Sequence, residues 1–280
     1  MELSDSKLEQ FAQDGYVVIE EFLTPLEVEA LRTRTAKLLT EFDPTTHKVV
    51  AFDTGLDDKH ISDQYFLDSA DKIHYFLEPT ALLADDELVV NKIGHGLHIV
   101  DPVFSAVTHS DKFRQLTQRL NYADARVLQS MVILKQPKVG GAVPMHQDSS
   151  FLFTKPLSAL GFWLALDKCT MANGCLEVLR GSSGEPITKR FVRSQGKTEM
   201  VDIEPTGGTK GAAAAAAAEG ECVPVEVGAG ALVLIHGQVL HRSAHNHSDQ
   251  PRWAYTFHVV DGTCEYDERN WLQMPELTKL

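Results

Sequence analysis

The residues of this chain that could carry chemistry centre on the run Pro144-Met145-His146-Gln147-Asp148. In an extended strand the side chains of His146 and Asp148 project to the same side, because successive residues alternate between the two faces. An imidazole and a carboxylate would then converge on one point. A second imidazole from a distant strand would complete a two-histidine, one-carboxylate facial triad, which binds Fe(II) and leaves positions open for other ligands.

The second imidazole has several candidates in the last third of the chain: His236, His241, His245, His247 and His258. Residues 231–235 are typical of a buried strand, so His236, which continues it, is expected to pack or to support a ligand. His245 and His247 fall in a polar turn before Pro251, where histidines are usually solvated. His241 lies just past the buried strand, and the residues alone leave the choice open.

Further motifs are spread along nearly the whole chain: Gln13-Asp14-Gly15-Tyr16-Val17-Val18-Ile19, Asn91-Lys92-Ile93-Gly94-His95, Asn173-Gly174-Cys175-Leu176, Ile235-His236-Gly237 and Asn270-Trp271-Leu272. Together with Pro144 to Asp148 they resemble the phytanoyl-CoA dioxygenase family of Fe(II)/2-oxoglutarate oxygenases. The sequence departs from the family in one place. After the Asn-Gly-Cys-Leu strand the family often has Pro-Gly-Ser-His, whereas this chain has Arg180-Gly181-Ser182-Ser183.

The resemblance implies that His146, Asp148 and His241 bind the iron, since His241 stands at the family's spacing before Arg252. It also implies that Arg252 pairs with the distal carboxylate of 2-oxoglutarate and that Ser243 shares that carboxylate. A buried guanidinium needs such an anionic partner because it cannot lose its charge. A structural salt bridge between Arg252 and an Asp or Glu of the chain is the alternative.

The resemblance also places Lys92, Met131 and Trp163 around the 2-oxoglutarate. From the residues alone, Lys92 would be a surface lysine, and Met131 and Trp163 would be core residues. Gln147 has two readings, a substrate contact or an ordinary residue of the sheet face.

Two histidines, His95 and His98, follow Lys92 closely in the sequence. They could orient a substrate or be hydrogen-bonded core histidines, and the sequence does not separate these readings.

The resemblance implies an oxidoreductase that converts 2-oxoglutarate and O2 into succinate and CO2 and hydroxylates a small-molecule substrate. Asp148 favours hydroxylation, because related halogenases replace this carboxylate with a small residue that admits halide. An iron- and 2-oxoglutarate-binding cupin-like sensor without coupled hydroxylation would use the same residues. A zinc hydrolase could also use two His and one Asp, but it would assign no role to Arg252.

Composition limits the other classes of function. The chain has 280 residues, of which 43% are hydrophobic, enough for one sizeable core, and we expect a single domain over residues 1–280. The net charge of −13 argues against nucleic acid as a partner. The four cysteines show no Cys-x-x-Cys spacing, which argues against a zinc site of that type and against a disulfide framework.

The sequence has no apolar stretch of about 20 residues and no signal peptide at its start, so we expect a cytoplasmic protein without a membrane span. Thr278-Lys279-Leu280 approaches the Ser-Lys-Leu peroxisomal address without matching it. We expect a monomer with a small-molecule substrate.

The N-terminal residues 1–42 are predicted to hold two helices. Ser6 and Glu9 form a capping box for the first, and Gly15 ends it before a strand over residues 16–19. Thr24-Pro25-Leu26-Glu27 starts the second helix, whose core-facing residues are Leu31, Leu38, Leu39 and Phe42.

The barrel core is predicted over about residues 90–262. A helix from Ser110 to Leu120 precedes the first long strand, residues 127–134, and Gly140-Gly141 makes a turn. Strands are also expected at 151–153, 231–235 and 252–260. Strands that recur with turns between them predict a mainly β fold with flanking helices and a double-sheet, jelly-roll core, and the family resemblance implies the double-stranded β-helix of cupin-like proteins.

Three other segments carry weaker expectations. Residues 43–90 mix charge, turns and aromatics, and we expect loops and short helices that form a wall or lid for the substrate. Lys189, Arg190 and Arg193 could form a small patch for an anion. The alanine run 212–218 between glycines is low-complexity sequence, and we assign it no chemistry.

Overall fold

The computed structural model describes residues 4–45, 64–78, 88–207, 222–274 and 276–280. The alanine run 212–218 lies outside the described residues. The wall or lid predicted over residues 43–90 is described only at 43–45, 64–78 and 88–90.

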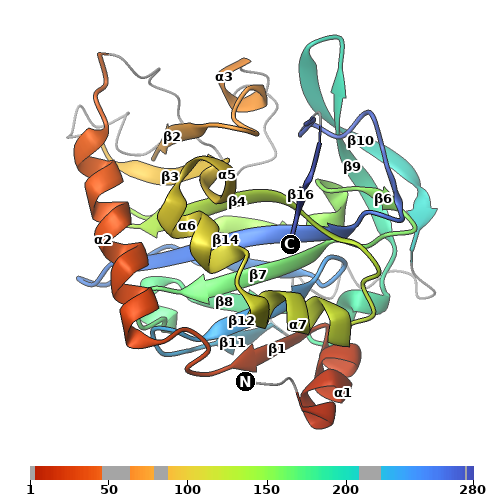
Figure 1. Cartoon of the computed structure of the whole chain (residues 1–280), viewed down its shortest axis with the longest axis horizontal. Helices are drawn as coiled ribbons and strands as arrows, with labels where there is room; N and C mark the ends of the chain where they lie inside the picture. Colours follow the sequence, from red (N-terminus) through yellow and green to blue (C-terminus); the bar gives the residue numbers. More distant parts are fainter. Residues whose placement is uncertain (1–3, 46–63, 79–87, 208–221, 275) are drawn as a thin grey trace.

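Helices flank a core made mainly of strands (Figure 1). The helices are α1 (Asp5–Asp14), α2 (Pro25–Glu41), α3 (Gln64–Leu67), α5 (Leu97–Val100), α6 (Pro102–Thr108) and α7 (Asp111–Arg119), with 3₁₀ turns η1 (Asp148–Ser150), η2 (Met171–Asn173) and η3 (Ser182–Gly184). The strands are β1 (Tyr16–Ile19), β2 (Ile73–Leu77), β3 (Val90–His95), β4 (Ala125–Lys135), β5 (Val143–His146), β6 (Thr154–Lys155), β7 (Leu160–Ala165), β8 (Leu176–Val178), β9 (Ile187–Ser194), β10 (Lys197–Thr206), β11 (Val223–Val225), β12 (Leu232–His236), β13 (His241–Ser243), β14 (Arg252–Asp261), β15 (Glu265–Tyr266) and β16 (Thr278–Lys279).

Two sheets form the jelly roll, which confirms the predicted fold class. The larger sheet has the order β1-β12-β7-β14-β4-β3-β2, with β16 also paired to β4, and the smaller has the order β11-β8-β13-β5. Strands β9 and β10 form a separate pair, as do β6 and β15. The strands predicted at 16–19, 127–134, 231–235 and 252–260 correspond to β1, β4, β12 and β14.

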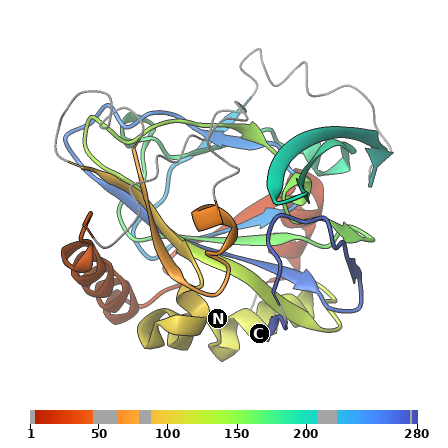
Figure 2. The same cartoon turned by 90° about the horizontal axis from the view of Figure 1, so that it is seen from above.

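The two faces of the larger sheet have different neighbours. On β14, Tyr255 and Phe257 belong to a buried cluster with Leu31 of α2, Phe104 of α6 and Phe113 of α7. Figures 1 and 2 show these helices on one side of the sheet. Because side chains alternate along a strand, the neighbours of Tyr255 and Phe257 on β14 turn to the opposite face.

The opposite face of the larger sheet packs on the smaller sheet. Trp163 and Ala165 of β7 and Ala254 of β14 share one buried cluster with Leu176 and Val178 of β8. This inner face also carries the polar residues of β14, starting with Arg252. The site therefore lies between the two sheets.

The N-terminal helices begin and end at residues that satisfy their backbone. In α2 the predicted capping box is present: Glu27 N–H donates to Thr24 Oγ1 at 3.3 Å, and Thr24 N–H donates to Glu27 Oε2 at 2.7 Å. Leu31 and Leu38 of α2 are buried, as predicted, and Leu39 and Phe42 pack against the same core. Ser110 precedes α7 at the predicted N-cap position.

The predicted start of α1 was wrong. The N-cap is Ser4, whose hydroxyl accepts from the N–H of Lys7, whereas Ser6 lies inside the helix and pairs with the Ser4 hydroxyl at 2.9 Å. Gly15 ends α1 as predicted, with a left-handed φ of 80° and its N–H on the carbonyl of Phe11.

The strand predicted at residues 151–153 was also wrong. The N–H groups of Phe151 and Leu152 donate to the carbonyl of Asp148, so the chain turns through η1 instead of extending. Leu152 and Phe153 are apolar because they are buried, at 1% and 2% exposure. Three consecutive apolar residues have no alternation that would distinguish a strand from a buried turn.

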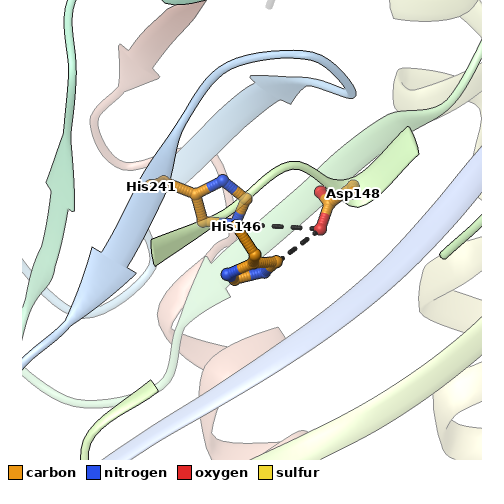
Figure 3. Close-up of side chains that lie close together, drawn as sticks. All are labelled: His146, Asp148 and His241. Carbon is orange, nitrogen blue, oxygen red and sulfur yellow. Dashed lines mark ion pairs between the residues drawn. The ribbon is translucent and has the colours of Figure 1, made fainter. Parts of the chain in front are cut away.

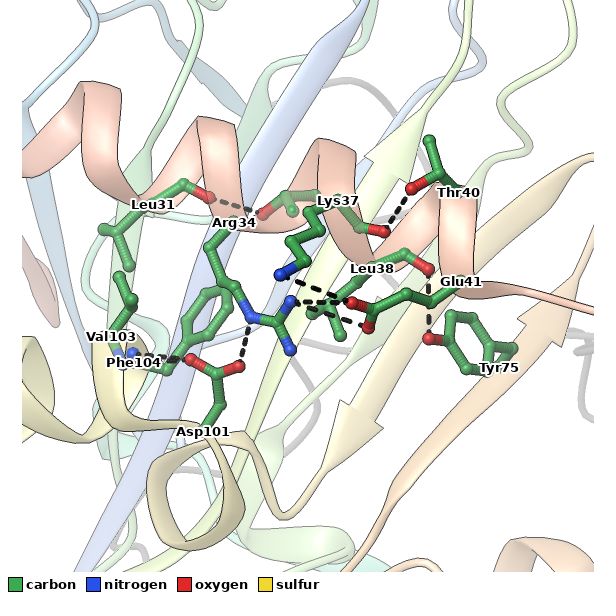
Figure 4. A network of polar contacts seen from close by, with 11 residues as sticks. Leu31, Arg34, Lys37, Leu38, Thr40, Glu41, Tyr75, Asp101, Val103 and Phe104 are labelled. Carbon is green, nitrogen blue, oxygen red and sulfur yellow. Dashed lines mark hydrogen bonds and ion pairs between the residues drawn. The ribbon is translucent and has the colours of Figure 1, made fainter.

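A network of hydrogen bonds and ion pairs connects α2 to α6 and to β2 (Figure 4). Arg34 of α2 donates to Asp101, and the other oxygen of Asp101 accepts from the N–H of Val103 and so caps α6. Tyr75 of β2 donates its hydroxyl to the carbonyl of Leu38 at 3.0 Å. One buried carboxylate therefore links two helices and fixes the helical layer behind the larger sheet.

None of the helices in the described part of the chain is both long and apolar enough to cross a lipid bilayer. The last residues pair with the larger sheet: Thr278 and Lys279 form β16 beside β4, and Leu280 is 7% exposed.

Candidate active site

His146, Asp148 and His241 are brought together at the ends of short elements (Figure 3). His146 ends β5, and His241 begins β13 directly opposite it in an antiparallel pair. Gln147 is extended, with φ of −118° and ψ of 128°, so Asp148 projects on the same side as His146 although it already begins η1. His146 and Asp148 therefore project to the same side, as predicted, although β5 ends at His146 and Asp148 lies outside it.

The three side chains form a compact set of ligand atoms. Oδ1 of Asp148 lies 3.5 Å from Nε2 of His146 and 3.8 Å from Nε2 of His241. One ligand atom from each residue falls within 4.8 Å of the other two. Among the described residues, no other group of His, Cys, Asp or Glu is arranged in this way.

Backbone carbonyls fix which nitrogen of each histidine is free. Nδ1 of His146 lies 2.9 Å from the carbonyl of Pro144, and Nδ1 of His241 lies 3.1 Å from the carbonyl of Val239. A carbonyl only accepts, so both Nδ1 atoms carry hydrogen, and in the neutral form of each ring Nε2 presents a lone pair. Two lone pairs and a carboxylate oxygen at these separations need a proton or a cation between them, so the donor set fits a metal ion.

The electrostatics of the set agree with this. Burial alone would raise the pKa of the Asp148 carboxyl, but the imidazoles of His258 and His241 and the hydrogen bonds to His146 and His258 hold it well below its usual value. Burial alone would lower the pKa of His146, but the hydrogen bond and charge of Asp148 raise it. Burial and the neighbouring His146 lower the pKa of His241 to about 4. An ionised carboxylate and a neutral His241 are the forms that ligate metal.

The other candidate histidines lie elsewhere. His236 accepts from the N–H of Gln238 at 3.2 Å, and the rings of His245 and His247 stack on each other with centroids 4.7 Å apart. His258 reaches the set without joining it, because its Nε2 lies 3.2 Å from Oδ2 of Asp148, the oxygen turned away from the other two histidines. The sequence identified His258 only as a rival ligand and missed this contact.

Arg252 is buried at the start of β14, and its surroundings argue against the structural salt bridge. The guanidinium is 1% exposed, and Nε donates to the carbonyl of Gly174 at 3.2 Å. Nη1 is buried without a hydrogen-bond partner in the described part of the chain, where no carboxylate forms an ion pair with Arg252. The guanidinium lies 5.5 Å from the ring centroid of Trp163. An unsatisfied buried cation fits a carboxylate-bearing ligand.

A second basic residue, Lys135, lies beside Arg252 and was missed in the sequence. The two residues are register partners in β4 and β14. Lys135 is 1% exposed, and its Nζ donates to the carbonyls of Gly141 and Ala244. Burial and the charge of Arg252 lower the pKa of Lys135 to about 6.

Gly174, in the Asn-Gly-Cys-Leu motif, allows the backbone near Arg252 to approach Ala244 closely. It has a left-handed φ of +77°, and a Cβ there would lie 2.4 Å from the carbonyl oxygen of Ala244. Its own carbonyl is the acceptor for Arg252. The motif therefore positions Arg252 through backbone atoms, which side-chain patterns do not reveal.

The residues assigned to the cosubstrate by resemblance share the inner face. Met131, Thr256 and Trp163 are aligned across β4, β14 and β7. Lys92 of β3 is 4% exposed, with its ammonium 4.9 Å from the ring centroid of Phe76, and burial lowers its pKa well below the usual value. A surface position for Lys92 is thus wrong.

Ser243, two residues after His241 on β13, is buried at 3% exposure. Contact of these four residues, Lys92, Met131, Trp163 and Ser243, with 2-oxoglutarate stays a prediction.

Three further polar residues have partners within the fold. Gln147 donates Nε2 to the carbonyl of Gln238 at 2.7 Å, which favours a structural role. His98 is fully buried, its Nδ1 lies 2.8 Å from the Ser130 hydroxyl, and burial lowers its pKa to about 3. His95 pairs through Nδ1 with the Ser69 hydroxyl at 2.6 Å. Both histidines match the hydrogen-bonded core alternative.

The departure from the family at residues 180–183 forms a tight turn. Gly181 is left-handed with φ of 75°, and η3 follows it. Ser182 is buried, donates its hydroxyl to the carbonyl of Leu179 at 2.7 Å and accepts from the N–H of Leu240 at 2.8 Å. The serine thus ties the turn to the segment that leads into β13.

The predicted anion patch on β9 is contradicted at its centre. Arg190 is 2% exposed, pairs with Asp267 at 2.9 Å and lies 3.7 Å from the ring centroid of Phe153. Its neighbour Lys189 lies 3.9 Å from Asp202. Alternation along β9 turns Arg190 inward, away from Lys189.

Comparison with known proteins finds similar sequences that cover nearly the whole chain. The sequence profile of the family described as phytanoyl-CoA dioxygenase (PhyH) matches residues 11–254. Phytanoyl-CoA dioxygenase domain-containing protein 1 of Bos taurus is 40% identical, covering 98% of this chain and 97% of that protein. A phytanoyl-CoA dioxygenase of Arabidopsis thaliana is 38% identical, covering 98% of this chain and 96% of that protein.

Solved structures share the fold at lower identity. EctD from S. alaskensis, solved with 2-oxoglutarate and 5-hydroxyectoine, has a TM-score of 0.68 and 19% identity, covering 98% of this chain and 84% of that chain. The non-heme alpha ketoglutarate dependent carbocyclase SnoK from nogalamycin biosynthesis has a TM-score of 0.66 and 19% identity, covering 99% of this chain and 96% of that chain.

Proposed function

The chain belongs to the phytanoyl-CoA dioxygenase family, and we propose that it is an Fe(II)- and 2-oxoglutarate-dependent dioxygenase that hydroxylates a small molecule. One observation carries the proposal. Nε2 of His146 and Nε2 of His241 lie 3.5 and 3.8 Å from Oδ1 of Asp148, with both Nδ1 atoms tied to carbonyls. That arrangement suits a divalent metal ion held on one face.

His146, Asp148 and His241 would hold the iron. With three ligands from the protein, the ion would keep positions open for ligands from outside the chain. When bound, iron and 2-oxoglutarate supply the oxidative decarboxylation to succinate and CO2 together with the oxidation of a substrate C–H bond. The retained carboxylate of Asp148 supports hydroxylation over halogenation.

Arg252 would anchor the cosubstrate by its distal carboxylate. The free Nη1 and the absence of an ion pair to Arg252 in the described residues support this role. A guanidinium is suited to it because its planar donors match the two oxygens of a carboxylate. By family resemblance, Ser243 shares that carboxylate, and Lys92, Met131 and Trp163 line the same space.

The protein's own contribution is the geometry of a mostly buried site. Asp148 and His241 are 7% and 5% exposed, and Arg252 is 1% exposed, whereas the His146 side chain is 25% exposed. Low exposure strengthens the charged contacts of Asp148 and Arg252, and His146 marks the side of the ligand set that is open to solvent. A zinc hydrolase would leave the buried guanidinium without an anion, so we favour the oxygenase.

Turnover tests this proposal against a binding-only sensor. The protein, loaded anaerobically with Fe(II) and 2-oxoglutarate, is exposed to air, and succinate is measured. We expect succinate from the wild type and none above background from Asp148→Ala. Wild-type protein that binds both ligands but yields no more succinate than the variant would establish the sensor instead.

A further inference from the structure

The two oxygens of Asp148 have different partners. Oδ1 faces His146 and His241 from the smaller sheet, whereas Oδ2 lies 3.2 Å from Nε2 of His258 on β14 of the larger sheet. Asp148 and His258 are 7% and 8% exposed. A buried contact between the two sheets thus engages one oxygen and leaves the other for the ligand set.

Gln129 fixes the imidazole of His258. It lies directly opposite His258 in the β4–β14 pair, and its Nε2 is 3.2 Å from Nδ1 of His258. An amide nitrogen donates, so Nδ1 accepts and a ring hydrogen sits on Nε2. His258 therefore donates to Oδ2 of Asp148.

Gly161 gives this contact its space. It is the partner of His258 on β7, the strand on the other side of β14. A Cβ at residue 161 would lie 3.2 Å from Oδ2 of Asp148 and 3.5 Å from Nε2 of His258. Three adjacent strands thus contribute a donor, its support and the room for the carboxylate.

We propose that His258, supported by Gln129, is a positioning residue that turns Asp148 so that only Oδ1 is offered to the metal. This rests on the proposed function, because it presumes a metal at His146, Asp148 and His241. Without the donor, the side chain of Asp148 can rotate, and either oxygen can face the histidines. Groups that hold metal ligands in place typically change metal affinity by about 10- to 100-fold when they are removed.

The test compares His258→Phe, which removes the donor, with His258→Gln, whose amide nitrogen can still reach Oδ2. Mn(II) binding to each protein is measured by calorimetry without 2-oxoglutarate, alongside unfolding of the metal-free protein. We expect about 10- to 100-fold weaker binding for His258→Phe and recovery of most of that loss in His258→Gln. Equal metal affinity of His258→Phe and wild type would overturn the proposal.

Gln129→Met provides a second arm if His258→Phe does not fold. It keeps the size of the side chain but removes the amide that fixes the ring of His258, so we expect a smaller loss of Mn(II) affinity with metal-free unfolding close to wild type. A loss of stability with unchanged Mn(II) affinity would mean a structural role only. Failure of the wild type itself to bind Mn(II) would instead refute the proposed function.

Discussion

His241 lies directly opposite His146 in the antiparallel pair of β5 and β13, and the centroids of their rings are 4.2 Å apart. Each ring donates from Nδ1 to the carbonyl two residues before it, which belongs to Pro144 within β5 and to Val239 in the turn that precedes β13. The two histidines are therefore held in the same tautomer by the same local device. A single cross-strand position supplies two ligands of the site.

Both His146 and His241 should be needed for the visible charge-transfer band of the complex with Fe(II) and 2-oxoglutarate. We expect wild-type protein with Fe(II) and 2-oxoglutarate under anaerobic conditions to give a weak visible charge-transfer band. His146→Ala and His241→Ala should lose the band, because each removes one of three ligands. His247→Ala, in the exposed turn before β14, is the control and should keep it. A normal band in either ligand variant would refute the ligand assignment.

Arg252→Met should weaken 2-oxoglutarate binding more than metal binding, because it removes the carboxylate anchor and leaves the three ligands intact. Loss of a buried charge-assisted contact costs about 2–5 kcal/mol. Calorimetry with Mn(II)-loaded protein measures the change. Arg242→Met is the matched control, since Arg242 pairs with Glu177 at 2.9 Å and is partly exposed. Equal 2-oxoglutarate affinity for the two variants would place the anchor elsewhere.

The parts of the fold that were predictable have strong local patterns. The alternation of β14, the apolar run of β12 and the complete cap of α2 each specify an element within about ten residues. The start of α1 was not predictable to the residue, because Ser4 and Ser6 are equally good caps by type. The apolar run 151–153 was wrongly predicted to be a strand, because its residues are apolar as a result of burial in a turn and not of strand pairing.

The metal-ligand pair His146 and Asp148 was predictable from a local pattern. The residues that hold the site's side chains in place were not predictable. His146 and Asp148 are two residues apart, so local geometry relates them. Gln129 and His258 meet only through the register of β4 and β14, and Gly174 acts through its backbone. One sequence carries no signal for the pairing of distant strands, so such roles need the folded structure.

Gly174→Ala should destabilise the protein and disturb Arg252. A left-handed φ costs a non-glycine residue about 1–2 kcal/mol, and a Cβ 2.4 Å from the Ala244 oxygen forces a backbone shift of further cost. Gly196 has the same φ of +77° with nothing within 4 Å of its Cβ position, so Gly196→Ala measures the φ cost alone. We expect Gly174→Ala to exceed it by about 1–3 kcal/mol in chemical denaturation. Equal losses of unfolding free energy in the two variants would show that the contact between the new Cβ and the Ala244 oxygen is relieved at no cost.

Asp267→Asn should lower stability in a pH-dependent way. Burial alone would raise the pKa of the Asp267 carboxyl, but hydrogen bonds from Arg190 and Arg269 outweigh it, so the folded-state pKa is lowered. Such a group stabilises the fold above the unfolded pKa of about 3.9, and this contribution is lost as the pH falls further. Near neutral pH we expect a loss of about 3 kcal/mol, because the buried Arg190 keeps its charge without its partner.

The gap between Asp267→Asn and wild type should therefore narrow below about pH 4, as measured by denaturant unfolding over a pH series. Asp202→Asn is the control, since Asp202 lies on β10, the strand paired with the one that carries Arg190, and is exposed 3.9 Å from Lys189. It should change stability by less than about 0.5 kcal/mol at any pH. A pH-independent gap for Asp267→Asn would mean that the variant acts through packing rather than charge.

The last prediction concerns the substrate. An acyl-CoA carries several phosphates, and this chain has a net charge of −13. Of the predicted cation patch, Arg190 is buried against Asp267, whereas Lys189 is exposed 3.9 Å from Asp202. The loss of Arg190 from the patch leaves Lys189 and Arg193 to hold several phosphates against the net charge of −13, so we expect 2-oxoglutarate turnover without coupled hydroxylation of phytanoyl-CoA.

Mass spectrometry of a reaction with phytanoyl-CoA, Fe(II) and 2-oxoglutarate decides the matter, with succinate measured in the same samples. We expect succinate to form at the rate seen without the acyl-CoA and no product heavier by one oxygen. Lys189→Ala should leave that rate unchanged, because the proposal gives this residue no part in binding. A product gaining one oxygen in stoichiometric match to succinate would establish the acyl-CoA as a substrate, and a smaller rate in Lys189→Ala would then locate its phosphates beside β9.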